Sequence, residues 1–188
     1  MNTPCKMHKI LILPNLSGKP TLLGIYTKTK EKWKLMESYQ ISNPLSDNLI
    51  PFFINLQKQK VAFDSLYFVR GPGSFMALKL IYLFAKTLEI TQNIKLYATN
   101  AFYFNANSPI KAYGNCYFIK EYPTKGEILA PTDKAFKSQP LEKEAREMGI
   151  TLRNYDSPPP MQPFVLPDFL NLALFDTQLK PLYLLPPV

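Results

Sequence analysis

The stretch Val69-Arg70-Gly71-Pro72-Gly73-Ser74-Phe75 lies between two apolar segments of different length. Residues 65–69 are a short apolar run that is typical of a buried strand, whereas residues 74–88 are long and apolar enough for a buried helix. Two glycines allow a sharp turn, and serine is a common residue at a helix N-cap. The stretch therefore predicts a strand-to-helix turn. Backbone N–H groups at the start of a helix also bind anions, so an anion site stays open.

The segments around this turn predict an α/β fold. Strands are expected at His8 to Leu13, Thr21 to Thr27, Trp33 to Ile41 and Ile94 to Ala98, and helices between Pro44 and Lys58 and over Ser74 to Leu88. The first three strands predict an antiparallel meander, and the strand, helix, strand unit over residues 65–98 predicts a parallel pair.

The first predicted helix lacks one clear start signal. Ser46, Asp47 and Asn48 are all expected caps, and Pro51 is expected in the first turn or at a kink. The second predicted helix is apolar on nearly every side, so several of its sides must be covered by other parts of the protein. Lys79 and Lys86 mark the one side that is expected to face solvent.

Signals weaken beyond residue 100, which divides the chain into a first lobe, 1–100, and a second lobe, 101–188. Here the pattern predicts a hairpin of Lys111 to Glu121 with Glu127 to Ala130, a polar helix from Gln139 to Met148 ended by Gly149, and a short helix from Asp168 to Phe175. Between the last two, five prolines in residues 157–167 predict an extended connector.

Composition excludes several protein classes. The chain has 188 residues, 46% of them hydrophobic, which is enough for a core. No apolar run is long enough for a membrane span and the first nine residues are too polar for a secretory signal, so a cytoplasmic protein is expected. Cys5 and Cys116 are expected to be free thiols. The net charge of +8 comes from scattered lysines, which indicates solubility or weak polyanion binding.

Few residues are suited to catalysis. The chain has one histidine, His8, so neither a paired-histidine metal site nor a histidine-dependent triad is expected. Neither cysteine has the context of a nucleophile. The sequence therefore predicts no catalytic residue and no metal ligand.

Several motifs together resemble the TsaB (YeaZ) family, whose members are accessory proteins in the threonylcarbamoyl-adenosine modification of tRNA. Residues 70–75 resemble the family's Arg-Gly-Pro-Gly-Ser-Phe segment, Leu49-Ile50-Pro51 resembles its Leu-Leu-Pro, and Pro181-Leu182-Tyr183-Leu184 resembles its closing Pro-x-Tyr-Leu. The resemblance is concentrated in residues 8 to 100. It implies an actin-like ATPase, RNase H-like α/β fold: a mixed sheet with flanking helices and a reduced second lobe.

The resemblance also implies a function. A TsaB-like chain is a non-catalytic subunit that supports TsaD, the paralogous catalytic subunit that transfers a threonylcarbamoyl group to adenosine in tRNA, and TsaE, an ATPase, joins the complex. No intrinsic cofactor is implied. ATP or ADP at an interface of the complex would meet the candidates Arg70, Gly71, Gly73 and Ser74. The tRNA is an indirect partner, and a homodimer is the alternative to the heterodimer.

The two predicted helices hold more apolar side chains than one small sheet covers, so an exposed remainder is expected to form an interface. Complete burial of both helices is the alternative. In the TsaB family, helices at these positions contact TsaD or a second TsaB. The residues of the predicted interface are Leu49, Phe52, Phe53, Leu56, Phe75, Met76, Lys79, Leu80 and Leu83.

Departures from the family pattern argue against independent nucleotide chemistry. The family's Asp-Thr-Ser after the first strand is replaced by Pro14-Asn15-Leu16-Ser17, which lacks the carboxylate, and its Thr-Gly after the central motif is Met76-Ala77. Where the family has an arginine after this motif, the chain has Lys79, and where the family has a histidine before its first long helix, the chain has Leu45. The family's Asp-Ala-Arg is not found near residues 110–112. Two rival functions remain: a nucleotide-binding ATPase or glycoprotease-like enzyme of the same fold, and a basic tRNA-binding scaffold.

Overall fold

The computed structural model describes residues 7–14, 19–121 and 147–184. The elements of the first half are β1 (His8–Leu13), β2 (Thr21–Thr29), β3 (Lys32–Ile41), α1 (Leu45–Lys58), β4 (Phe63–Val69), α2 (Phe75–Gln92) and β5 (Lys95–Thr99). Those of the second half are the 3-10 helix η1 (Ala101–Phe104), β6 (Ile110–Lys111), β7 (Cys116–Lys120), β8 (Ile150–Asn154), β9 (Phe169–Leu170) and the 3-10 helix η3 (Leu172–Leu174).

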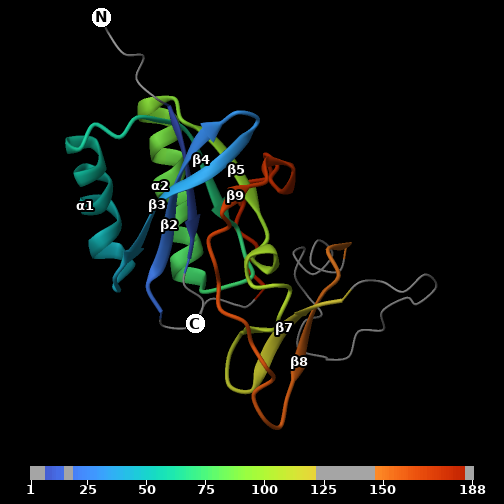
Figure 1. The fold of residues 1–188 in the computed structure, drawn as a ribbon. Coiled ribbons are helices and arrows are strands. Elements are labelled where there is room, and N and C mark those ends of the chain that lie inside the picture. The colour runs from blue at the N-terminus through green and yellow to red at the C-terminus, as the bar shows by residue number, and fades with distance from the viewer. Residues whose placement is uncertain (1–6, 15–18, 122–146, 185–188) are drawn as a thin grey trace, which may run out of the picture.

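The larger sheet has the strand order β5-β4-β1-β2-β3-β9 (Figure 1). β1, β2 and β3 form the predicted antiparallel meander, with Ile10 opposite Ile25. β4 pairs in parallel with both β1 and β5. The predicted fold class is therefore confirmed: a mixed sheet with two parallel connections, each of which contains a helix.

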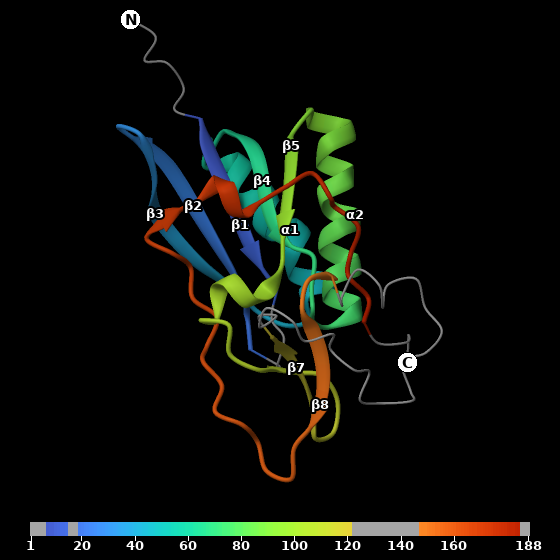
Figure 2. The ribbon, with the colours of Figure 1, turned by 90° about the vertical axis from the view of Figure 1, so that its right-hand side faces the viewer.

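The two faces of this sheet are covered differently. Both helices lie on one face, where Ile10, Ile12, Leu66 and Phe68 pack beneath them. Alternate residues such as Leu11 and Leu13 point to the other face, which is covered by residues from 101 onward (Figure 2). Because both faces are covered, β1 and β4 are buried along almost their whole length.

The second half of the chain contributes to both sheets. β9 adds to the edge of the larger sheet beside β3, and β6, β7 and β8 form a separate three-stranded sheet. In Figure 1 this small sheet lies below the larger one. Residues 157–167 contain neither helix nor strand, which confirms the predicted extended connector.

Three local predictions need correction. α1 begins after Pro44 and has no side-chain cap; instead, Asn48 Nδ2 donates to the carbonyls of Ser42 and Pro44. Of the two alternatives for Pro51, the first turn is wrong, because Pro51 lies inside α1 beyond that turn. The helix predicted from residue 168 is replaced by β9 and the short η3, because Asn171, rather than Asp168, caps the helical turn by accepting from the Ala173 N–H.

Other predictions fall partly outside the described residues. These include Cys5, the replacement of the first-strand motif at Asn15 to Ser17, the turn and second strand over 122–130, and all but the last two residues of the polar helix 139–148. Within the described chain, the strand predicted over 111–121 is divided between the end of β6 and β7, and β7 pairs with β6 on one side and β8 on the other. Gly149 has φ +68°, as the predicted helix end requires.

Candidate functional site

The loop of residues 70–74 is fixed to its surroundings by backbone hydrogen bonds. The Arg70 N–H donates to the Thr99 carbonyl at 2.9 Å, and the Ala101 N–H donates to the Gly71 carbonyl at 2.8 Å. These bonds connect the end of β4 to the end of β5 and the start of η1. The carboxyl ends of the two parallel strands are thereby held together.

Arg70 is directed into the protein and is only 2% exposed. Its guanidinium donates to the Lys180 carbonyl and to Gln178 Oε1, both at 3.2 Å. A buried guanidinium needs such acceptors, because an unpaired buried charge costs several kcal/mol. Arg70 therefore holds the C-terminal segment in place.

Gly71 lies against the same segment. The Leu182 N–H donates to the Arg70 carbonyl at 2.6 Å, and a Cβ added at Gly71 would lie 2.8 Å from the Leu182 carbonyl oxygen. With φ at +133°, position 71 also has a backbone conformation that favours glycine. Tyr183 follows Leu182, and the centre of its ring lies 4.5 Å from the centre of the Phe75 ring. The glycine thus permits close packing between loop and C-terminal segment.

Ser74 begins α2 as predicted. Its Oγ accepts from the Ala77 N–H at 3.5 Å, a long cap bond, and the residue is exposed. Gly73 is half-buried. Of the four candidate cofactor residues, Arg70 and Gly71 contact the chain's own C-terminal segment, and Ser74 is the one at the surface.

The predicted interface residues fall into three groups. Leu49, Phe53 and Leu56 are in the core, at 1%, 5% and 2% exposure, so they cannot contact a partner in this structure. Phe52, Phe75 and Leu80 are half-buried. Met76, Lys79 and Leu83 are exposed.

Three exposed apolar residues were missed: Ile50 and Ile54 on α1, and Ile90 on α2. Ile90 continues a row that begins with Met76 and Leu83, because these three residues are spaced by seven along one helix. A count of heptad spacing would have found it. Ile50 and Ile54 are four apart, so they also share one side of their helix.

The β2–β3 hairpin gathers positive charge. Lys28, Lys30, Lys32 and Lys34 are all exposed on it, and Glu31 is the acidic residue at its tip. Lys32 Nζ lies 5.5 Å from the centre of the Phe169 ring, which is itself half exposed. The lysines that look scattered in the sequence therefore share one hairpin.

Within residues 7–14, 19–121 and 147–184, no three His, Cys, Asp or Glu side chains come together as metal ligands. His8 Nδ1 shares a 2.7 Å hydrogen bond with Thr27 Oγ1, and Cys116 is a half-buried free thiol. Burial, followed by the charge of Asp168, raises the pKa of Tyr26 above its usual value. In the described part of the chain, no helix has the length and apolarity that crossing a bilayer requires.

The strand order and directions define an α/β domain built on one mixed sheet, with both helices on the same face. Among solved structures, YeaZ from Pseudomonas aeruginosa is similar at 14% sequence identity and a TM-score of 0.45, over 60% of this chain and 58% of that chain. An uncharacterized protein described as similar to peptidase YeaZ from Pseudomonas aeruginosa has 15% identity and a TM-score of 0.43, over 60% and 57%. The match thus spans less than two thirds of either neighbour. No family model and no curated protein matches the sequence.

Proposed function

We propose that this chain is a non-catalytic TsaB-like subunit that binds a TsaD-type catalytic subunit through the outer face of α1 and α2. The observation that supports this most is the row of Met76, Leu83 and Ile90, which are 70%, 51% and 80% exposed. The row extends over about 21 Å of α2. Single exposed apolar residues are common on proteins, but a row along one helix can pack against a partner's helix.

The neighbouring helix extends this surface. The Phe53 and Phe84 rings are 4.6 Å apart, which holds α1 beside α2. Ile50 and Ile54, 54% and 48% exposed, lie on the side of α1 away from its core residues. We call the set of Ile50, Ile54, Met76, Leu83 and Ile90 the helical face. Lys79 is exposed between Met76 and Leu83, and its charge would select an acidic rim on the partner.

Under this proposal the loop at residues 70–74 is structural. It starts α2 and anchors the C-terminal segment, so Arg70 and Gly71 would shape the helical face rather than bind nucleotide. ATP or ADP would bind at an interface of the complex, where the exposed Ser74 is available, and TsaE would supply ATPase activity. The site of action would be the cytoplasm, with tRNA bound by the partner.

A mass measurement by light scattering tests the proposal. The purified chain, mixed with the TsaD homologue of the same cell, is expected to form a heterodimer, and Leu83→Glu and Ile54→Glu are expected to abolish it. Met161→Glu is the matched control, because Met161 is 44% exposed and lies outside both helices. The proposal would be overturned if both helix variants still formed the heterodimer, or if the unmodified chain formed no heterodimer. A homodimer that Leu83→Glu dissociates would make a second copy the partner.

The basic hairpin favours a second candidate function, a tRNA-binding scaffold. Four exposed lysines beside an exposed aromatic ring suit phosphate contacts and base stacking. This candidate requires that the chain alone binds tRNA with a steep salt dependence. Changing Lys28, Lys30, Lys32 and Lys34 to Glu would then remove the binding, whereas Lys58→Glu with Lys60→Glu at the end of α1 would leave most of it. ATP turnover by the purified chain would instead favour the other rival function, a nucleotide-binding ATPase of the same fold.

A further inference from the structure

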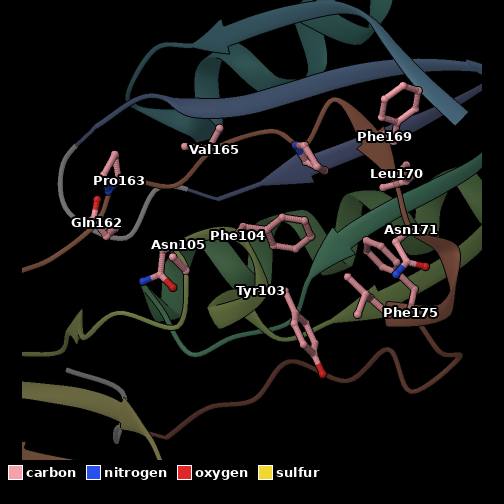
Figure 3. Close-up of a pocket in the computed structure, with 13 residues that line it drawn as sticks. Tyr103, Phe104, Asn105, Gln162, Pro163, Val165, Phe169, Leu170, Asn171 and Phe175 are labelled. Carbon is pink, nitrogen blue, oxygen red and sulfur yellow. The ribbon is translucent and has the colours of Figure 1, made fainter.

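A cavity of about 440 Å³ lies on the sheet face opposite α1 and α2. Its walls come from η1 and the residues just after it, from the proline-rich connector, and from the chain through β9 and η3 (Figure 3). The volume is within the range of small-molecule sites, roughly 300–1,000 Å³. Because the helical face is on the other side, this cavity is separate from the proposed interface.

The lining of the cavity is apolar and aromatic. Phe104 and Phe175 pack with ring centres 6.1 Å apart, and Phe175 is held edge-on against Tyr67 of the core. Tyr103 and Phe169 are 42% and 50% exposed. No lining side chain among the described residues has a formal charge. An ion would lose its hydration here without a charged partner, so a neutral ligand is favoured.

One buried polar atom of the lining has no hydrogen-bond partner among the described residues. Asn105 is 2% exposed, and its Nδ2 donates to the Ser108 carbonyl at 2.9 Å. That bond shows which end of the amide is Nδ2 and which is Oδ1, because a flipped amide would place two oxygens in contact. Asn105 Oδ1 is then a buried acceptor without a hydrogen bond in the described structure. Such acceptors are rare in folded proteins, because burial removes water without replacing it.

We propose that this cavity binds a small, planar, uncharged molecule with a single N–H or O–H donor. The aromatic walls would enclose its ring, and a modest shift of the Asn105 amide would let Oδ1 accept from the donor. In Figure 3 the Asn105 side chain lies between Gln162 and Pro163 on the left and the rings of Phe104, Tyr103 and Phe175 on the right. The ligand class follows from a partly open, mainly apolar cavity whose lining includes one unpaired buried acceptor.

Two probes of nearly equal size test this proposal on the full chain: indole, which has an N–H donor, and benzothiophene, which has none. Titrations followed by ¹H–¹⁵N NMR are expected to shift the amide signals of Asn105, Val165 and Asn171. Indole should bind at least about fivefold tighter, since one hydrogen bond to a buried acceptor has that effect. Benzothiophene is the more apolar probe, so non-specific partitioning would give the opposite order.

Variants distinguish the cavity from the rest of the surface. Val165→Trp adds bulk at a lining residue that is 59% exposed, and it should weaken both probes at least tenfold. Met36→Trp, at a residue 57% exposed on β3 and outside the lining, is the matched control and should leave both affinities unchanged. Asn105→Leu should remove the preference for indole while benzothiophene still binds.

Equal affinity for the two probes, or shifts that persist in Val165→Trp, would overturn the proposal. No saturable shift with either probe would mean that water alone fills the cavity, and this too would overturn it. None of these variants changes the helical face, so heterodimer formation can succeed or fail independently of the cavity.

Discussion

The Arg70 carbonyl accepts a 2.6 Å hydrogen bond from the Leu182 N–H, and this bond joins two segments that are far apart in the sequence. Each segment contains one of the motifs that resemble the TsaB family. Tyr183 packs on Phe75 beside the bond, so the central motif and the closing motif contact each other through both backbone and side chains. This packing explains the glycine at position 71 and the aromatic residues at positions 75 and 183.

Gly71→Ala is expected to destabilise the fold by about 3 kcal/mol, because it combines a strained φ with a clash at the Leu182 carbonyl. Gly114→Ala is the control: Gly114 also has a positive φ, +48°, but nothing lies within 4 Å of its added Cβ. That variant should cost about 1 kcal/mol from backbone conformation. Urea denaturation measures both free energies of unfolding. Equal losses would contradict the close approach at Gly71.

Leu182→Ala is expected to cost about 2–5 kcal/mol, because Leu182 is 1% exposed in the core. Combined with Gly71→Ala, it should destabilise by at least about 0.5 kcal/mol less than the sum of the two single changes. The reason is that a loosened C-terminal segment can move away from the new methyl group. A double-mutant cycle in urea measures this coupling. Strict additivity would mean that the two residues are energetically independent.

The fold could be predicted from the sequence because its strands and helices are strongly patterned. The meander needed only short apolar segments separated by turn residues, and α2 needed only a long apolar run after a serine. The exposed apolar residues of the two helices were less predictable. Leu49, Phe53 and Leu56 repeat at spacings of four and three, which is the pattern of a core-facing stripe, so the exposed residues are their neighbours Ile50 and Ile54.

The features that depend on tertiary contacts had no local signal. An arginine directly before a Gly-Pro-Gly loop suggests an exposed anion ligand, yet Arg70 is buried and bonds to Gln178 and Lys180. The cavity needs η1, the connector and β9 together, which are distant in sequence. The four lysines could have been assigned to one hairpin from the sequence, since they lie in and beside the expected turn between two antiparallel strands.

Leu49→Ala and Ile50→Ala, at adjacent positions of α1, should affect different properties: the first the stability of the fold, the second the binding of the proposed partner. Leu49 is 1% exposed and its truncation is expected to cost about 2–5 kcal/mol of stability. Ile50 is 54% exposed, so its truncation should change stability by about 0.5 kcal/mol or less but weaken binding of the TsaD-type partner. Urea denaturation and a binding titration separate the two quantities. A large loss of stability in Ile50→Ala would show that Ile50 belongs to the core.

Tyr26 is expected to make the fold sensitive to alkaline pH. It is fully buried, and its hydroxyl donates to the Pro167 carbonyl at 2.9 Å. Burial, and secondarily the charge of Asp168, raises its pKa above the usual value near 10, so the folded state keeps the proton at a pH where the unfolded chain loses it. The contribution to stability is therefore complete below about pH 10 and is lost as the pH rises, by up to about 1.4 kcal/mol per pH unit.

Tyr26→Phe should remove this term and flatten the alkaline loss. At pH 8 the variant is expected to be less stable by about 1 kcal/mol, because the hydrogen bond to Pro167 is absent. Between pH 8 and pH 11 it should lose about 1.4 kcal/mol less than the unmodified chain, as measured by urea denaturation. Tyr103→Phe, at a tyrosine that is 42% exposed, is the control and should follow the unmodified chain. If Tyr26→Phe and the unmodified chain lose stability in parallel up to pH 11, the Tyr26 hydroxyl must already reach solvent, and the packing of residues 164–170 over this sheet face would be looser than the structure has it.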